Sequence, residues 1–77
     1  IKNPTQKSIK FHPNPVNNIL NIATDRNDLT YHIYNVLGAR VLSTNSKNIN
    51  VSHLEKGIYI IKSLSKETHY IGRFAKH

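Results

Sequence analysis

Leu54-Glu55-Lys56-Gly57-Ile58-Tyr59-Ile60-Ile61-Lys62 is the stretch of the sequence that decides the fold. Gly57 can adopt the positive φ that a tight corner requires, and the residues that follow it are β-branched or aromatic, as strands prefer. Side chains alternate between the two faces of a strand, and positions 58 to 61 are apolar on both faces. The stretch therefore predicts a central strand that begins at a glycine corner.

Tyr59 follows Gly57 by two residues, a spacing that suggests a tyrosine corner. In that arrangement the ring packs in the core while the hydroxyl group donates a hydrogen bond to a backbone group upstream. Leu54 is expected to plug the core at the start of the corner. These predictions concern the fold, and by themselves they say nothing about function.

Shorter segments with strand character lie on both sides of this stretch. They are expected at residues 9–12, 17–22, 29–35, 39–43, 49–51 and 68–75. Leu20 and Ile22 are expected on an inner face, and Tyr34 is expected to point outward. In the last segment, Tyr70 and Phe74 should share one face.

Turn signals separate these segments roughly every eight to twelve residues. Pro13-Asn14-Pro15 predicts a rigid turn, because two prolines fix φ and remove backbone donors. Gly38 predicts a hairpin turn with positive φ. No window shows a helical period. The fold class is therefore predicted to be all-β, a small immunoglobulin-like β-sandwich of about seven short antiparallel strands.

The length of 77 residues allows one small domain with a thin core. There is no cysteine for a disulfide or a thiolate metal site, and no apolar run approaches the ~18 residues of a membrane span. The chain contains no methionine and opens on polar residues with an early proline. We therefore expect a piece of a longer protein, with a linker or lead-in at residues 1–8 and the domain at residues 9–77.

The charge of the chain is compatible with two interpretations. Eleven basic residues against four acidic ones give a formal net charge of +7, which would suit an anionic partner. The alternative is an ordinary soluble surface of the kind that an AT-rich genome encodes. The basic residues are dispersed from Lys2 to Lys76, whereas a binding footprint is expected to cluster, and this favours the second interpretation.

Chemistry-bearing patterns are missing from the sequence. The three glycines are too far apart for a phosphate-binding loop, and the four acidic residues lie in turns without a carboxylate pair. The five histidines have neither HxH nor HxxxH spacing, so surface positions are favoured over a zinc site. The aromatic residues could stack on nucleic-acid bases, but packing in so small a core is favoured. We expect no catalytic residue, no metal, no cofactor and no nucleic-acid partner.

The strand and turn markers, taken in order, resemble a known family. They are Phe11-His12-Pro13-Asn14-Pro15, Leu20-Asn21-Ile22, Tyr31-His32-Ile33-Tyr34-Asn35-Val36-Leu37-Gly38-Ala39-Arg40-Val41, Leu54-Glu55-Lys56-Gly57-Ile58-Tyr59 and Arg73-Phe74-Ala75-Lys76. This order and spacing resemble the C-terminal sorting domain, type A, of the type IX secretion system of Bacteroidota. The resemblance covers about residues 9–77. Ala75 departs from the pattern, because the family more often has a larger aliphatic residue there.

The resemblance implies a delivery role. Members of the family follow a cargo domain that reaches the periplasm, and outer-membrane shuttle proteins and the type IX translocon then carry the protein to the cell surface or the medium. In many systems a sortase-like peptidase removes the domain and joins the cargo to lipopolysaccharide. Removal is expected within or ahead of residues 1–8. By resemblance, the residues expected to matter for recognition are Pro13, Asn14, Pro15, Gly38, Gly57, Tyr59, Arg73, Phe74 and Lys76.

Two functional interpretations follow. The preferred one is a non-enzymatic sorting signal that is recognised as a folded sandwich, with Arg73 and Lys76 reaching solvent. The rival is an adhesive or ligand-binding β-sandwich module for anionic glycan or nucleic acid. The turn at residues 13–15 can serve both the fold and recognition, whereas Gly57 and Tyr59 are expected mainly to maintain the fold.

Overall fold

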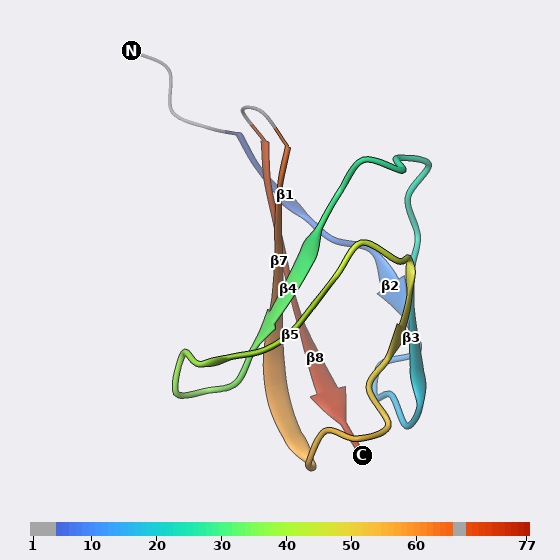
Figure 1. Cartoon of the computed structure of the whole chain (residues 1–77), viewed down its shortest axis with the longest axis vertical. Coiled ribbons are helices and arrows are strands. Elements are labelled where there is room, and N and C mark those ends of the chain that lie inside the picture. Colours follow the sequence, from blue (N-terminus) through green and yellow to red (C-terminus); the bar gives the residue numbers. More distant parts are fainter. Residues whose placement is uncertain (1–4, 66–67) are drawn as a thin grey trace.

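The computed structural model of the chain describes residues 5–65 and 68–77. Within these ranges it contains eight strands and no helix (Figure 1). The strands are β1 (Thr5–Ser8), β2 (Phe11–His12), β3 (Ile19–Ile22), β4 (Tyr31–Tyr34), β5 (Arg40–Thr44), β6 (Asn48–Asn50), β7 (Gly57–Ser65) and β8 (Thr68–Lys76). The described part accordingly has no helix that is long and apolar enough to cross a membrane.

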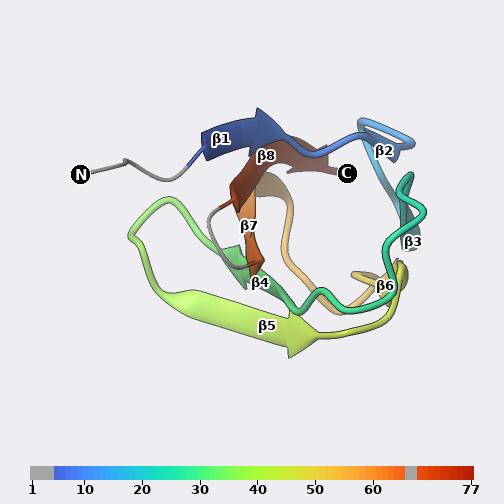
Figure 2. The same cartoon turned by 90° about the horizontal axis from the view of Figure 1, so that it is seen from above.

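The strands form two sheets. One has five strands in the order β1-β8-β7-β4-β5, and the other has three in the order β2-β3-β6. Figure 2 shows β2, β3 and β6 together on one side of the five strands. All pairs are antiparallel except that of β1 with β8. The predicted all-β sandwich is confirmed.

The first strand departs from the expected arrangement. The sequence predicts a polar lead-in over residues 1–8, but Thr5–Ser8 pairs in parallel with the start of β8 and raises the strand number to eight. Residues 1–4 lie outside the described residues. Residues 5–8 are all polar, and Lys7 and Ser8 are exposed. The sequence therefore lacks the alternation of apolar and polar residues by which a strand could be predicted here.

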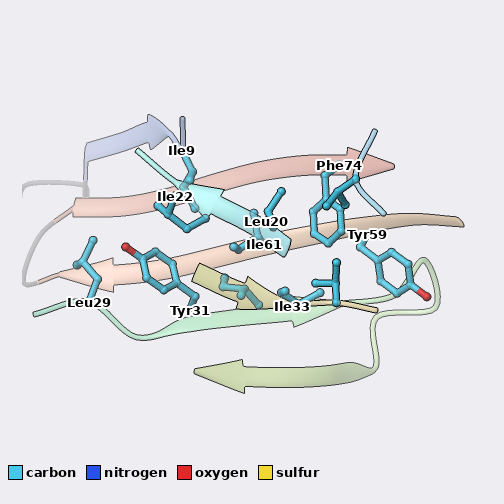
Figure 3. Close-up of a cluster of buried hydrophobic side chains, with 12 residues drawn as sticks. Ile9, Leu20, Ile22, Leu29, Tyr31, Ile33, Tyr59, Ile61 and Phe74 are labelled. Atoms are coloured by element: carbon cyan, nitrogen blue, oxygen red, sulfur yellow. The ribbon is translucent and has the colours of Figure 1, made fainter. Parts of the chain in front are cut away.

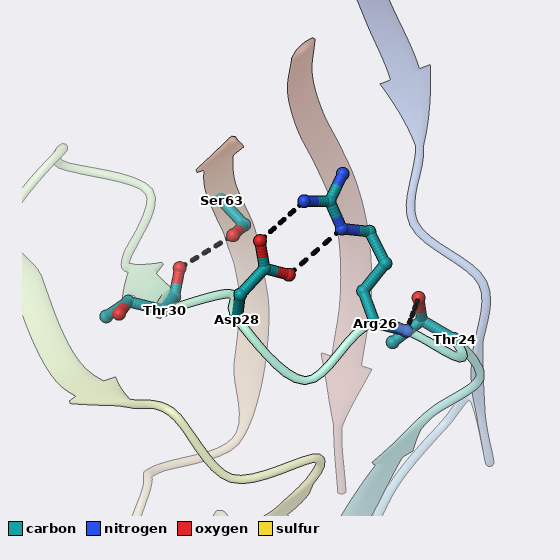
Figure 4. A network of polar contacts seen from close by, with 5 residues as sticks. All are labelled: Thr24, Arg26, Asp28, Thr30 and Ser63. Atoms are coloured by element: carbon teal, nitrogen blue, oxygen red, sulfur yellow. Dashed lines mark hydrogen bonds and ion pairs between the residues drawn. The ribbon is translucent and has the colours of Figure 1, made fainter. Parts of the chain in front are cut away.

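β7 occupies the central position that the sequence predicts. It lies between β8 and β4 and is paired with both. Tyr59, Ile61 and Ser63 face inward and are buried. The hydroxyl group of Ser63 donates a hydrogen bond of 2.7 Å to the backbone carbonyl of Thr30 (Figure 4), so this buried polar group is satisfied.

The core fills the space between the two sheets (Figure 3). Its buried members are Ile9, Val16, Leu20, Ile22, Leu29, Tyr31, Ile33, Ile49, Val51, Tyr59, Ile61 and Phe74. The inward positions predicted for Leu20 and Ile22 are therefore confirmed. Tyr70 and Leu54 are partly buried and pack against the same cluster, as predicted.

The loop between β3 and β4 is fixed by local polar contacts (Figure 4). The guanidinium group of Arg26 donates to both carboxylate oxygens of Asp28, with 3.0 Å between Nε and Oδ1. The hydrogen bond to Asp28, followed by one to Tyr70, raises the pKa of Arg26 above its usual range. This pair lies at the surface, where an ion pair adds little to stability, so it orders the loop more than it strengthens the fold.

Candidate functional site

The turn at residues 13–15 is bound to the end of the last strand. The side-chain Oδ1 of Asn14 accepts a hydrogen bond of 2.9 Å from the backbone N–H of Ala75. The backbone N–H of Val16 donates to the carbonyl of Ala75, and the N–H of His77 donates to the carbonyl of Val16, both at 2.9 Å. Val16 and Lys76 thus form a parallel bridge. The turn closes the edge of β8 that β1 does not reach.

The two prolines shape this turn as the sequence predicts. Pro13 and Pro15 flank Asn14, and both preceding peptide bonds are cis. The turn follows β2 directly, and its three residues are exposed. In Figure 1 the C-terminus lies at the same end of the molecule as the loop that follows β2.

Aromatic rings connect the turn, the corner and the last strand beneath this surface. The ring of Phe74 stacks on that of Tyr59, with centroids 5.6 Å apart. Phe11, the residue that begins β2, meets Phe74 edge to face at 6.2 Å. Such pairs add a modest stabilisation beyond the area that they bury. Phe74 therefore joins both sheets at this end of the sandwich.

The tyrosine corner is present as predicted. The hydroxyl group of Tyr59 donates a hydrogen bond of 2.8 Å to the backbone carbonyl of Glu55. Gly57 has a φ of 152°. A Cβ at this glycine would meet nothing within 4 Å, so the requirement for glycine comes from the backbone angle and not from space. Gly57 pairs with Lys76, which places the corner directly beside the end of β8.

The prediction that both basic residues of the last strand reach solvent is wrong for Lys76. Arg73 is exposed, but Lys76 is only 9% exposed. Positions 74 and 76 share a face of the strand because side chains alternate, so Lys76 lies on the buried side with Phe74. Its ammonium group donates a hydrogen bond of 2.8 Å to the carbonyl oxygen of His77. The pairing of β7 with β8 also fixes the register at Ala75, which lies opposite Ile58.

Gly38 lies apart from these residues, in the predicted β4–β5 hairpin. It has the expected positive φ of 85°. The side-chain Oδ1 of Asn35 accepts hydrogen bonds from Leu37 and Ala39, which closes the turn. A surface hollow lined by residues 35–37 and 55–59 places the hairpin beside the corner. Gly38 does not line that hollow, so its role is to shape the turn.

Val16 is the member of this site that the sequence does not single out. It has no exposed surface, and its backbone holds the end of β8 on both sides of Lys76. An isolated apolar residue directly after Pro15 is the one local sign of this role. The contact itself spans some sixty residues of sequence, and no local pattern announces such a pairing.

Side chains that could bind a metal do not gather in the described residues. There, no three histidine, aspartate or glutamate side chains lie close enough to hold a metal ion. His32 contacts the hydroxyl group of Ser43 at 2.9 Å, on the outer side of β4 and β5. The arrangement offers a shaped surface at the end of β8.

The comparisons with known proteins agree with this geometry. A family model described as the secretion system C-terminal sorting domain matches residues 10–77. This match covers nearly all of the chain, including the turn, the corner and the last strand. No curated protein matches the chain.

Proposed function

Because the chain belongs to the family of type IX secretion C-terminal sorting domains, we propose that the machinery recognises it as a folded sandwich and reads the end of β8 with the turn bound to it. The proposal is supported most by the contact between Asn14 and Ala75. This contact joins two segments that the resemblance marks for recognition but that lie far apart in the sequence. A linear signal would need no such contact.

The family identifies the chain as a signal for export to the surface or the medium, which implies contact with the type IX machinery and with a cargo protein. We propose that cargo and signal cross the periplasm together and that shuttle proteins at the outer membrane engage the folded domain. The domain acts by binding and not by catalysis. Of the predicted recognition residues, Pro13, Asn14, Pro15 and Arg73 have exposed side chains and are suited to contact a partner directly, whereas the exposed Gly38 and Gly57 have none to offer. The role that we assign to Gly57, Tyr59, Phe74 and Lys76 is to hold that surface in place, and Gly38 shapes the separate β4–β5 turn.

Removal by a sortase-like peptidase is also part of the proposal. A peptidase needs an extended segment that is accessible on both sides, and Thr5–Ser8 is paired with β8. We therefore propose that cleavage occurs ahead of Thr5, in the part of the lead-in that precedes β1.

The test replaces Asn14 by alanine in a chain fused to a periplasm-targeted fluorescent protein in a type IX-competent host. Asn14→Ala removes the acceptor for the N–H of Ala75, and we expect export to fall about fivefold or more. Asn27→Ala, at an exposed position in the β3–β4 loop, is the matched control. Melting temperatures are measured on the same purified variants. Export at the wild-type rate by a folded Asn14→Ala variant would remove the turn from the recognised surface.

A further inference from the structure

The outer face of the five-stranded sheet has no covering layer in the described structure. We use this name for the side turned away from β2, β3 and β6, whose central residues are Tyr34, Ile58, Lys62, Leu64, Ile71 and Arg73. The core lies on the opposite side of the sheet. What the outer face presents to its surroundings is therefore not dictated by packing within the domain.

Apolar side chains are concentrated on and beside this face. Ile58 is 45% exposed and Leu64 is 60% exposed, although both belong to the central strand. At the tip of the neighbouring β4–β5 hairpin, Val36 is 72% exposed and Leu37 is 89% exposed. Exposed apolar surface on a small domain can mark an interaction site.

The surface of this face is hollowed. A hollow of about 410 Å³ lies over β4, β7 and β8, with Tyr34, Lys62, Leu64 and Ile71 in its lining. Its lining is mixed, because Thr30, His32, Ser63 and His69 also contribute to it. The hollow beside the corner, described above, has Ile58 in its lining. A concave surface with apolar and polar groups can receive protruding side chains of a partner.

The charge of the outer face has one sign. Arg40, Lys62 and Arg73 are exposed at outward positions of β5, β7 and β8. The described outward positions of β4, β5, β7 and β8 contain no aspartate or glutamate. The ammonium group of Lys62 lies 5.4 Å from the ring centroid of Tyr34, so this cation lies against an aromatic ring of the same face.

From these observations we infer that the outer face docks a protein surface that carries acidic side chains together with apolar ones. Exposed apolar side chains interspersed with arginine and lysine are compatible with a protein interface, where apolar residues and arginine contribute together. A nucleic acid or another linear polyanion would instead call for a row of cations along a groove. The inference rests on the proposed function, because the acidic partner is then a component of the secretion machinery.

Two pairs of variants test the inference in the export assay. Lys62→Glu with Arg73→Glu reverses the charge of the outer face, and Lys7→Glu with Lys10→Glu makes the same charge change at exposed positions elsewhere. Ile58→Ser with Leu64→Ser removes two exposed apolar side chains from the outer face. Ile19→Ser is the control, because it changes a similarly exposed isoleucine on the three-stranded sheet. We expect export to fall about tenfold or more for the two outer-face variants and less than about twofold for the controls.

The same purified variants are titrated with outer-membrane fractions from the competent host and from a secretion-deficient strain, with phosphatidylglycerol vesicles and with heparin. The inference predicts that only the competent membranes bind, and that the outer-face variants lose this binding. Equal export by outer-face variants and controls would overturn it while leaving the sorting function intact. Binding of vesicles or heparin through the same residues would overturn it in favour of a lipid or polyanion site. Failure of the wild-type fusion to leave the periplasm would instead overturn the proposed function itself.

Discussion

Tyr31 places a polar hydroxyl group in the buried core. The residue is 1% exposed, and its hydroxyl group has no hydrogen-bond partner within residues 5–65 and 68–77. Burial, with smaller contributions from Asp28 and Tyr70, raises the pKa of this hydroxyl group above its ordinary value. The folded state therefore holds this proton more tightly than the unfolded chain does.

This linkage predicts how stability depends on alkaline pH. Between the ordinary tyrosine pKa of about 10 and the raised folded pKa, the unfolded state loses the proton while the folded state keeps it, so stability falls as pH rises. Tyr31→Phe removes this pH-dependent contribution. The substitution also removes a polar atom that has no hydrogen-bond partner in the described residues, so we expect the free energy of unfolding at pH 7 to change by less than about 1 kcal/mol. Urea unfolding from pH 7 to about pH 11 should show the variant gaining on the wild type. A constant difference across that range would contradict the account.

At the scale of the element, β8 shows how alternation overrides charge. Lys76 and Arg73 carry the same charge, but Lys76 comes three positions after Arg73. Because side chains alternate along a strand, the two lie on opposite faces. The bridge to Val16 then covers the buried side at the end of the strand. The corner and the hairpin, by contrast, each depend on a single glycine, and its positive φ can be predicted from the neighbouring residues.

The two basic residues should therefore respond differently to the same substitution. Arg73→Glu changes an exposed position and is expected to alter the free energy of unfolding by about 0.5 kcal/mol or less. Lys76→Glu places a carboxylate at a position that is 9% exposed and should cost about 1–3 kcal/mol. Urea unfolding of both variants at pH 7 makes the comparison, and each serves as the other's control for net charge. Equal stability of the two variants would show that Lys76 is not held on the buried side.

Local signals predicted most of the fold, and long-range contacts account for what was missed. The strand after Gly57, the tyrosine corner and the inward positions of Leu20 and Ile22 each follow from a spacing of a few residues. β1 carries no such spacing, because its pairing depends on backbone groups and its described side chains are exposed. The contact of Asn14 with Ala75 depends on how the two sheets close together, which periodicity does not encode.

For the molecule as a whole, the surface that we propose for recognition exists only when the chain is folded. The turn, the corner and the last strand come from three parts of the sequence and meet through Phe74 and its two aromatic neighbours. Unfolding would separate them. We therefore propose that the sorting information resides in the tertiary structure, and we expect folding and export to be lost together.

Secretion of a fluorescent reporter fused to the chain tests this claim most directly. The wild-type fusion and an Ile61→Asp fusion are compared in a type IX-competent host and in a secretion-deficient strain. Ile61 has no exposed surface, so an aspartate there should unfold the domain. We predict that the wild-type reporter reaches the medium or cell surface in the competent host alone, and that the Ile61→Asp reporter stays in the periplasm of both. An intact, folded wild-type fusion retained in the competent host, or an unfolded variant exported at the wild-type rate, would contradict the account.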